Sequence, residues 1–333
     1  MNTWNSPIRR RTLLQAAAAS ATLTALPRIA CAQAAWPAKP VRFVVPFAPG
    51  GSSEIVARSL AVELSKTLGQ QVFVDNKPGA AGNIAMQEVA TSAPDGHTLI
   101  LGHIGTLAVN PYIFDKLPYD PVRDFAPVSL LAKVPSLYLV PASSPFRTLK
   151  DLVEHARRNP GKLNYGSAGN GSAGHLAMEY LKAASNLFIV HVPYRGTGPQ
   201  LTDLLAGRLD AASVGAPAVM GHIRAGTLRA IATGTTTRLP LLPDVPTVAE
   251  QGFPGFEMTQ WYGLLAPART PPAVLARLGE ETQKAVRAES MRKRLAADTA
   301  LPVGGPGTEF AAFIASEQKR WQPVIARARI KPD

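Results

Sequence analysis

Cysteine is almost absent from this sequence of 333 residues, which has a single one, Cys31. The 6 histidines show no spacing typical of a metal site, and the sequence has neither a Gly-Lys-Ser/Thr phosphate loop nor a Gly-x-Ser-x-Gly motif. No apolar run long enough to span a bilayer follows the N-terminal region. These absences exclude a disulfide framework and predict no metal site, no serine hydrolase and no transmembrane span in the mature chain.

Acidic residues are also scarce, because 23 Asp and Glu residues stand against 35 Lys and Arg residues, a formal charge of +12. The basic residues form no cluster interleaved with aromatic residues, which make up only 7% of the chain, so we expect no nucleic-acid partner. A generally basic surface favours small anionic ligands instead. The apolar fraction of 46% is typical of a globular protein, and the length allows two domains.

Residues 1–32 have the pattern of an export signal that is removed from the mature protein. Three arginines precede the apolar stretch Leu13–Leu26, and Ala30–Ala32 fits a small-x-small cleavage site. The segment Arg10–Leu14 resembles a twin-arginine signal, although general secretion accepts such a segment as well. Cleavage after Ala32 would remove Cys31 and leave a chain that is still net basic. We therefore expect a soluble protein in the periplasm.

A strand, a glycine-rich turn and a helix open the mature chain. The near-continuous apolar run Val41–Phe47 predicts a strand buried on both faces, as in a parallel sheet. Pro49–Gly51 turns the chain, Ser52 or Ser53 is expected to cap the helix, and Gly69 is expected to end it. Free N–H groups and the helix dipole make such a junction suitable for an anion. An ordinary strand-to-helix turn needs the same glycines, so both interpretations stay open.

Alternating strands and helices continue along the chain and predict an α/β fold with a parallel sheet. The strand–glycine loop–helix unit recurs at 162–184, and further junctions of this kind occur at 98–106 and 190–198. Two α/β lobes whose junctions face each other would form a cleft at the carboxyl ends of the strands. Phe125–Val140 is expected to hold two strand pieces joined at Lys133–Pro135, as a crossover between the lobes.

One glycine motif has to be weighed as a cofactor site. Gly169-x-Gly171-x-x-Gly174 matches the dinucleotide fingerprint and follows a strand, but it lies mid-chain, and no acidic residue ends the next strand. Arg195 stands there instead and would suit the 2′-phosphate of NADP, so an exported NADP-dependent oxidoreductase stays as an alternative. No nucleophile, base and oxyanion site come together in the sequence, so we expect neither catalysis nor a cofactor.

Motifs spread over the mature chain resemble those of one receptor family. They include PFAPGG at Pro46–Gly51, NKPGAAGNIA at Asn76–Ala85, PDGHTL at Pro94–Leu99, YDPVRDFAPVSLLA at Tyr119–Ala132, LNYGSAGNGSAGHLA at Leu163–Ala177, VPYRGTGPQLTDLLAGRLD at Val192–Asp210, LPDVPTVAEQGFPGFE at Leu242–Glu257 and WYGLLAPA at Trp261–Ala268. In these motifs the sequence resembles the substrate-binding receptors of tripartite tricarboxylate transporters, also called the Bug family of extracytoplasmic solute receptors. The resemblance covers essentially the whole mature chain.

The resemblance implies a type II periplasmic-binding-protein fold, in which two α/β lobes joined by a two-strand hinge close around a ligand like a Venus flytrap. Lobe 1 would consist of residues 36–135 and 255–333, and lobe 2 of residues 136–254. A monomeric receptor would capture a small carboxylate, such as a di- or tricarboxylate, an acidic amino acid or an aromatic acid, for the permease subunits of a membrane transporter. A ligand sensor for a membrane signalling partner would use the same cleft and stays as a further alternative.

The resemblance also implies which loops hold the ligand, because in the family backbone groups and ordered waters of opposing loops bind the carboxylate. We expect Gly51 and Gly169 to allow close backbone approach to it, or to need a positive φ. The implied ligand-binding residues are Phe47, Pro49, Gly50, Gly51 and Ser52 after the first strand, His103, Gly105 and Thr106 after the third, and Ser167, Ala168, Gly169, Asn170, Gly196, Thr197 and Gly198 in lobe 2.

Several side chains near these loops have roles that the sequence leaves open. His103 and His175 lie at glycine-rich junctions and are candidates for lining the cleft. His191 alternates within a strand, which favours a packed histidine. Tyr262 either edges the cleft or packs inside a lobe. The family often has Asp where Glu54 stands here, so the longer side chain is expected to change the cleft shape or the ligand preference.

Overall fold

A computed structural model describes residues 36–328, 330 and 331. The residues from Pro37 onward form one unit. The expected export signal at 1–32, with its twin-arginine segment and cleavage site, lies outside the described residues and stays a prediction. None of the helices in the described part of the chain is both long and apolar enough to cross a membrane.

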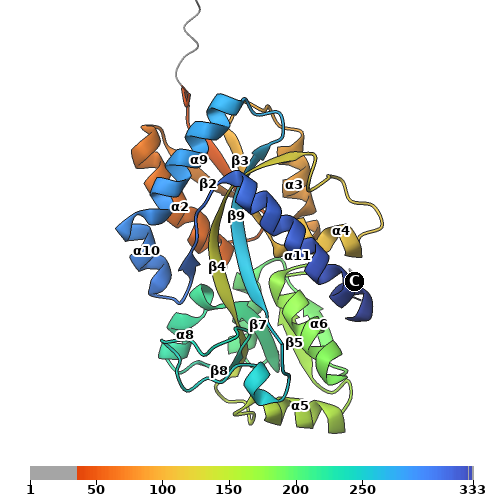
Figure 1. The fold of residues 1–333 in the computed structure, drawn as a ribbon. Coiled ribbons are helices and arrows are strands. Elements are labelled where there is room, and N and C mark those ends of the chain that lie inside the picture. The colour runs from red at the N-terminus through yellow and green to blue at the C-terminus, as the bar shows by residue number, and fades with distance from the viewer. Residues whose placement is uncertain (1–35, 329, 332–333) are drawn as a thin grey trace, which may run out of the picture. The chain divides into compact units, whose positions relative to one another are not determined.

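The first sheet is built on the predicted opening strand (Figure 1). In spatial order it contains β2 (Val72–Asn76), β1 (Val41–Val45), β3 (Thr98–His103), β9 (Thr259–Pro267) and β4 (Phe125–Pro141), and the short β10 (Leu301–Pro302) also pairs with β4. The strands β1, β2 and β3 are parallel, whereas β9 is antiparallel to both β3 and β4. The apolar side chains of β1 are buried, and its one charged residue, Arg42, forms ion pairs with Asp75 and Glu88.

The second sheet shares β4 with the first. It contains β7 (Ala211–Gly215) beside β4, then β5 (Asn164–Ser167) and β6 (Val190–Pro193), while β8 (Leu228–Thr233) pairs with β4 as well. The strands β5, β6 and β7 are parallel, so the second half of the chain repeats the parallel α/β arrangement of the first. The α/β class and the two-lobed fold predicted from the sequence are therefore confirmed.

The strand β4 corrects one prediction, because two strand pieces were expected and the structure has one continuous strand of 17 residues. It pairs with β9 from Phe125 to Pro135 and with β7 and β8 from Ser136 onward. Pro135, which lacks an N–H group, lies where β4 changes partners, and therefore it does not interrupt the strand. This change of partners supports the predicted lobe boundary at 135/136, and the lobe limits stay a prediction. In Figure 1, β4 and β9 run side by side from one sheet toward the other.

Helices cover both sheets. Those of the first half are α2 (Ser52–Leu68), α3 (Asn83–Ala90), α4 (Asn110–Ile113) and the short turns η1 (Ala80–Gly82) and η2 (Gly105–Val109); those of the second half are α5 (Leu149–Arg158), α6 (Ala173–Ser185), α7 (Thr197–Leu205), α8 (Met220–Arg224), η3 (Ala216–Ala218) and η4 (Ala249–Gln251). Three C-terminal helices, α9 (Pro272–Arg287), α10 (Glu289–Ala296) and α11 (Gly307–Ala328), return to the first half of the chain, where α9 packs on α2 and α11 on β4. A capping box at Thr148 begins α5, since its Oγ1 accepts from Asp151 N at 3.1 Å.

Two local predictions were wrong. The N-cap of α2 is Gly51, not Ser52 or Ser53, because both serines already lie inside the helix and the Ser52 hydroxyl donates to Gly215 O instead. The glycine loop expected in the junction at 98–106 is not present, since β3 extends to His103 and the π-helical turn η2 begins at Gly105. The polar helix α10 has no long apolar stripe, and the extended residue Ala288 separates it from α9.

Candidate functional site

Three helix N-termini converge on one small cavity between the two sheets. The helices α2, α6 and α7 have 17, 13 and 9 residues, and their first turns contribute Ser52, Ala173 and Thr197 to the lining. A helix N-terminus offers N–H groups without intrahelical partners and a partial positive charge. The cavity has a volume of about 40 Å³. This arrangement favours an anionic group in the cavity, and its size limits how much of a ligand fits there.

The cavity is lined by neutral side chains only, within the described part of the chain. It has no Lys, Arg, Asp or Glu in its wall, so hydrogen bonds and helix dipoles rather than ion pairs would hold an anion. The polar lining residues are Ser52, Ser53, His103, Ser172, Thr197, Gln200, Ser213, Gln260 and Tyr262.

Most of the buried polar groups in this wall already have partners inside the protein. Ser52 Oγ donates to Gly215 O at 3.1 Å, and Gln200 Nε2 donates to Gly166 O at 2.9 Å. Tyr262 OH donates to Gln260 Oε1 at 3.0 Å, and burial raises the pKa of the Tyr262 hydroxyl well above its ordinary value. These groups therefore shape the cavity as fixed, uncharged dipoles.

His103 is held in one orientation at this cavity. Its Nδ1 accepts a hydrogen bond from the backbone N–H of Thr106 at 3.0 Å, and its ring stacks on Phe47 with the ring centroids 4.5 Å apart. The side chain is only 2% exposed, and this burial lowers the pKa of the imidazole to about 4. His103 is therefore a neutral ring at physiological pH.

The loops that approach each other across the cavity are in direct contact. A Cβ atom on Gly51 would lie 2.9 Å from Thr197 Oγ1, and one on Gly105 would lie 2.2 Å from Gly171 O. Gly51 has a φ of −96°, so the expectation that it needs a positive φ is wrong, whereas Gly169 has a φ of +114°. A side chain at Gly51 would therefore contact the Thr197 side chain on the opposite loop.

A groove of about 250 Å³ shares part of the cavity's wall. Phe47 and Ala168 line both spaces, and the groove adds Gly169, Asn170 and the exposed Arg195. The volume of the groove is large enough for a short chain of atoms, whereas the volume of the cavity is not. A ligand bound in the cavity would therefore extend past Phe47 into this groove.

The structure separates the sequence-predicted residues into three groups. Phe47, Ser52, His103, Ala168 and Thr197 line the cavity, and Gly169 and Asn170 line the groove. The other predicted residues lie in the adjoining loops, turns and element ends and do not line either space; they are Pro49, Gly50, Gly51, Gly105, Thr106, Ser167, Gly196 and Gly198. Contact of any of them with a ligand stays a prediction.

Part of the cavity wall was missed from the sequence. Ser213–Gly215 end the strand β7, and Gln260 alternates with the buried Trp261 on β9. The position of Ser213–Gly215 at the carboxyl end of a parallel strand was the available signal. The open question about Tyr262 is resolved by its place in the cavity wall. The full set of missed residues is Ser53, Ser172, Ala173, Gly174, Gln200, Ser213, Val214, Gly215 and Gln260.

Two residues that the sequence left open lie outside the cavity wall. His175 is buried, accepts from Gly171 N at 3.2 Å through its Nδ1 and stacks on His191 with the ring centroids 4.4 Å apart. Glu54 accepts from Gly50 N at 2.7 Å and forms an ion pair with Arg58. Glu54 therefore stabilises the glycine loop before α2 without lining the cavity.

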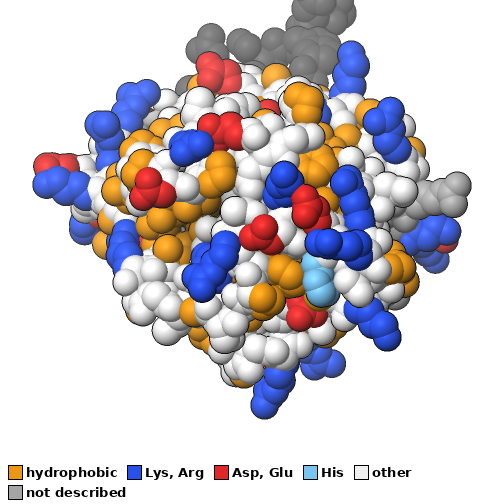
Figure 2. Space-filling view, turned by 90° about the horizontal axis from the view of Figure 1, so that it is seen from below, with side chains coloured by type: hydrophobic (Ala, Val, Ile, Leu, Met, Phe, Trp, Pro, Cys, Tyr) orange, Lys and Arg blue, Asp and Glu red, His pale blue; other side chains and the backbone are white. Residues whose placement is uncertain are grey.

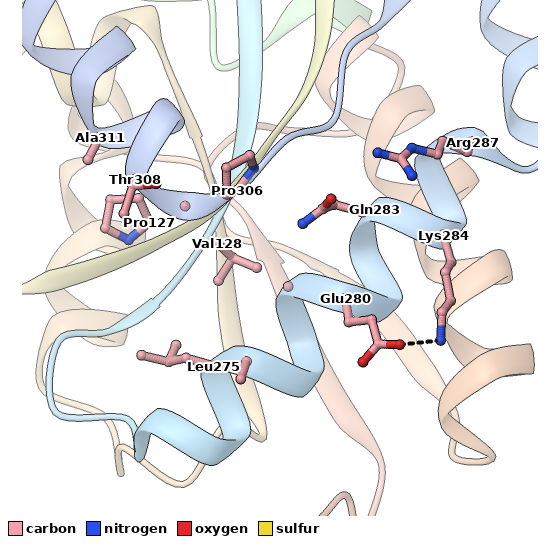
Figure 3. A pocket seen from close by; sticks show the side chains of 13 residues that line it. Pro127, Val128, Leu275, Glu280, Gln283, Lys284, Arg287, Pro306, Thr308 and Ala311 are labelled. Atoms are coloured by element: carbon pink, nitrogen blue, oxygen red, sulfur yellow. Dashed lines mark ion pairs between the residues drawn. The ribbon is translucent and has the colours of Figure 1, made fainter.

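Larger hollows and surface charges do not offer a comparable site. A hollow of about 660 Å³ lies between α9 and the start of α11, where the exposed Lys284 and Glu280 form an ion pair at 2.7 Å (Figure 3). Its floor is mostly apolar, formed by residues such as Val128 and Leu275. Figure 2 shows Lys and Arg side chains dispersed among Asp and Glu on one face of the molecule. The convergence of helix N-termini distinguishes the small cavity from both.

Two α/β lobes that share a pair of long strands, with helix N-termini meeting at their junction, define a bilobal solute-binding receptor. Residues 56–330 match the tripartite tricarboxylate transporter family receptor, and the chain belongs to this family of periplasmic receptors. A UPF0065 protein of Pseudomonas sp. (strain P51) is 41% identical over 89% of this chain and 88% of its own length. Protein BugT of Bordetella pertussis is 35% identical over 89% of this chain and 91% of its own.

Solved structures agree with this assignment. Rpa4515 of R. palustris with adipate has a TM-score of 0.87 and 37% identity, covering 90% of this chain and 100% of that one. MatC (Rpa3494) from Rhodopseudomonas palustris with bound malate has a TM-score of 0.84 and 36% identity, covering 87% and 100%. The periplasmic binding protein BugD has a TM-score of 0.86 and 32% identity, covering 89% and 99%. These relatives are solute-binding proteins, so the chain is not an enzyme, and the oxidoreductase alternative is wrong.

Proposed function

We propose that the protein captures a small dicarboxylate in the space between its lobes and delivers it to the permease subunits of a tripartite tricarboxylate-type transporter. The observation that carries this proposal is the meeting of three helix N-termini at a cavity with an uncharged polar wall. Such a wall suits a carboxylate, which accepts several hydrogen bonds at once. The adipate and malate bound to two relatives support the same ligand class.

The sizes of the two spaces indicate how a dicarboxylate would lie. A cavity of about 40 Å³ has room for one carboxylate group, which takes about the space of three waters. The remaining atoms would extend into the groove of about 250 Å³, where Arg195 can meet the second carboxylate. A ligand of this length cannot enter while the loops touch, so the lobes have to separate along β4 and β9 to admit it.

The expected affinity follows from the number of donors. Hydrogen bonds to a charged acceptor contribute roughly 1.5–3 kcal/mol each. Three or four such bonds, reduced by the free energy of ordering the ligand and closing the lobes, correspond to micromolar binding at about −8 kcal/mol. The protein would thus respond to low micromolar concentrations of the acid.

A thermal-shift panel with matched ligands tests the proposal. Adipate, malate, glutamate and benzoate are compared with adipamide, which keeps the carbon chain and lacks the charges, and with a sugar. At least one dicarboxylate should raise the melting temperature, because a ligand that binds only the folded state stabilises it, by about 2.7 kcal/mol at a hundredfold excess over Kd. If no acid shifts the transition, or if adipamide shifts it equally, the carboxylate assignment fails.

The assignment of the second carboxylate needs its own variant. Replacing Arg195 by Gln should weaken adipate by about tenfold and leave benzoate unchanged, because only the dicarboxylate reaches the groove. Replacing the exposed Arg158 of α5 by Gln is the matched control for lost charge.

The permease partner is tested separately, by measuring uptake of the binding acid in cells with and without this protein. Unchanged uptake would leave a receptor without a transport role.

A further inference from the structure

His103 carries an inference that goes beyond capture of a carboxylate and rests on that proposed function. Two features fix its position, since its ring stacks on Phe47 and its backbone lies at the end of β3, in register with Tyr262 of β9. His103 and Thr106 also form two reciprocal hydrogen bonds. The backbone N–H of His103 donates to Thr106 Oγ1 at 3.3 Å, and the backbone N–H of Thr106 donates to His103 Nδ1 at 3.0 Å. The ring therefore has little freedom to turn.

The contact with Thr106 determines where the ring carries its proton. A backbone N–H group can only donate, so Nδ1 has to present its lone pair to it. In a neutral imidazole the proton then lies on Nε2, which makes Nε2 a hydrogen-bond donor. Charged neighbours do not compete for this proton, because no charged residue lines the cavity in the described part of the chain, and the facing Tyr262 is kept neutral by burial.

Two donors at this cavity have no partner within the described residues. They are His103 Nε2 and Ser213 Oγ, in side chains that are 2% and 1% exposed. Their residues line the same cavity from opposite sheets, His103 from β3 and Ser213 from β7. A buried donor without an acceptor destabilises the protein, and a ligand oxygen between the two would satisfy both.

We propose that His103, locked as the Nε2–H tautomer by the backbone of Thr106, donates to the ligand carboxylate together with Ser213 and thereby selects a hydrogen-bond acceptor at this end of the cleft. The ring binds as a neutral donor and not as a cation. Ligand binding then takes up no proton at this site, and an ammonium or other donor group is disfavoured beside His103 Nε2, because this nitrogen presents a hydrogen and has no free lone pair. His103 is a specificity-determining residue, whereas Thr106 is a positioning residue that acts through it.

Calorimetric titration of adipate and malate into the purified protein tests the donor. His103→Phe keeps the stack on Phe47 and removes the N–H, and it should weaken the preferred acid by at least tenfold. His103→Gln places an amide N–H near the position of Nε2 and should recover most of this loss. Ser213→Ala should weaken the acid by about fivefold. His222→Gln on α8, away from the cavity, is the matched control and should leave the affinity unchanged.

Two measurements on the wild-type protein remain informative if a variant does not fold. Titrations at pH 6.5 in buffers of different ionisation enthalpy should show no net proton uptake, and the nitrogen chemical shifts of a ¹⁵N-labelled His103 should identify the Nε2–H tautomer. Uptake of about one proton per ligand, or the opposite tautomer, would overturn the inference, as would full affinity in His103→Phe. If the wild-type protein binds no acid, the proposed function itself fails. If it binds the acid and His103→Phe binds equally well, only the role of His103 fails.

Discussion

Two histidines of this protein have similar local contacts but different positions relative to the cleft. His103 at the end of β3 accepts from Thr106 N at 3.0 Å, and His175 in the first turn of α6 accepts from Gly171 N at 3.2 Å, in both cases through Nδ1. Both rings are buried and stacked, His103 on Phe47 and His175 on His191. Only His103 lines the cavity.

The difference between the two rings lies in what surrounds their other edge. His175 packs into lobe 2 below the glycine loop, where the stack with His191 continues to Tyr165 at 4.8 Å. The Nε2 of His103 has no partner among the described residues and belongs to the wall of the cavity. A backbone N–H that fixes the tautomer is therefore common to both histidines, and the tertiary position decides between a structural ring and a ligand donor.

Replacing His175 by Ala should produce the largest loss of stability. It removes a buried ring, its stack on His191 and the acceptor for Gly171 N, so we expect the free energy of unfolding to fall by about 3 kcal/mol. The affinity for the acid should change by less than about threefold where the protein is folded, because the ring does not line the cavity. Chemical denaturation and calorimetry measure the two quantities. A stable variant with strongly reduced affinity would reverse the comparison and make His175 the ligand residue.

The pH dependence of stability tests the burial of the His103 ring. Burial lowers the pKa of His103 from its ordinary value of 6.5 to about 4, so between these values the unfolded chain binds a proton that the folded protein does not. The contribution of His103 is fully present above pH 6.5 and is lost as the pH falls toward 4, by about 3 kcal/mol. Denaturation midpoints of the wild-type protein and His103→Phe should therefore converge as the pH falls from 7 to 4.5. Parallel curves would show that the ring titrates normally.

The sequence predicted the elements better than the site, and the reasons are physical. Apolar periodicity and glycine turns identified β1, α2 and their repeat at 162–184, because burial on both faces of a parallel sheet leaves a clear pattern. The lining role of Phe47 and Thr197 followed from the family motifs. Ser213 has only its position at the end of a strand as a signal and Gln260 has none, since their place in the wall depends on how β7 and β9 align across β4. Register and lobe contact are long-range properties that a single sequence does not show.

A second comparison is between a glycine that faces the opposite lobe, Gly51, and a glycine that faces no other atom, Gly279. Gly51→Val would place its Cβ 2.9 Å from Thr197 Oγ1 on the opposite lobe, at a φ that valine tolerates. We expect about tenfold weaker binding with a stability change of about 1 kcal/mol or less, because the clash opposes closure of the lobes more than folding. Gly279→Val on α9, where a Cβ meets no atom within 4 Å, is the control and should keep full affinity. A sharp fall in the denaturation midpoint with unchanged affinity would indicate a structural turn instead.

The smallest effect on stability and affinity is expected at Glu54, which stabilises the same loop without lining the cavity. Its carboxylate accepts from Gly50 N at 2.7 Å and pairs with the exposed Arg58, and it does not line the cavity. Glu54→Asp is one methylene shorter and loses both contacts, which should reduce stability by about 0.5 kcal/mol and shift the ratio of adipate to malate affinity by less than about threefold. Glu54→Gln keeps the acceptor for Gly50 and loses the ion pair, so it should retain the wild-type ratio. Because Glu54 acts only through the loop, a tenfold change of that ratio in Glu54→Asp, with Glu54→Gln unaffected, would mean that the position of the Gly50 N–H itself selects the ligand. The ligand preference would then depend on the loop before α2 as much as on His103.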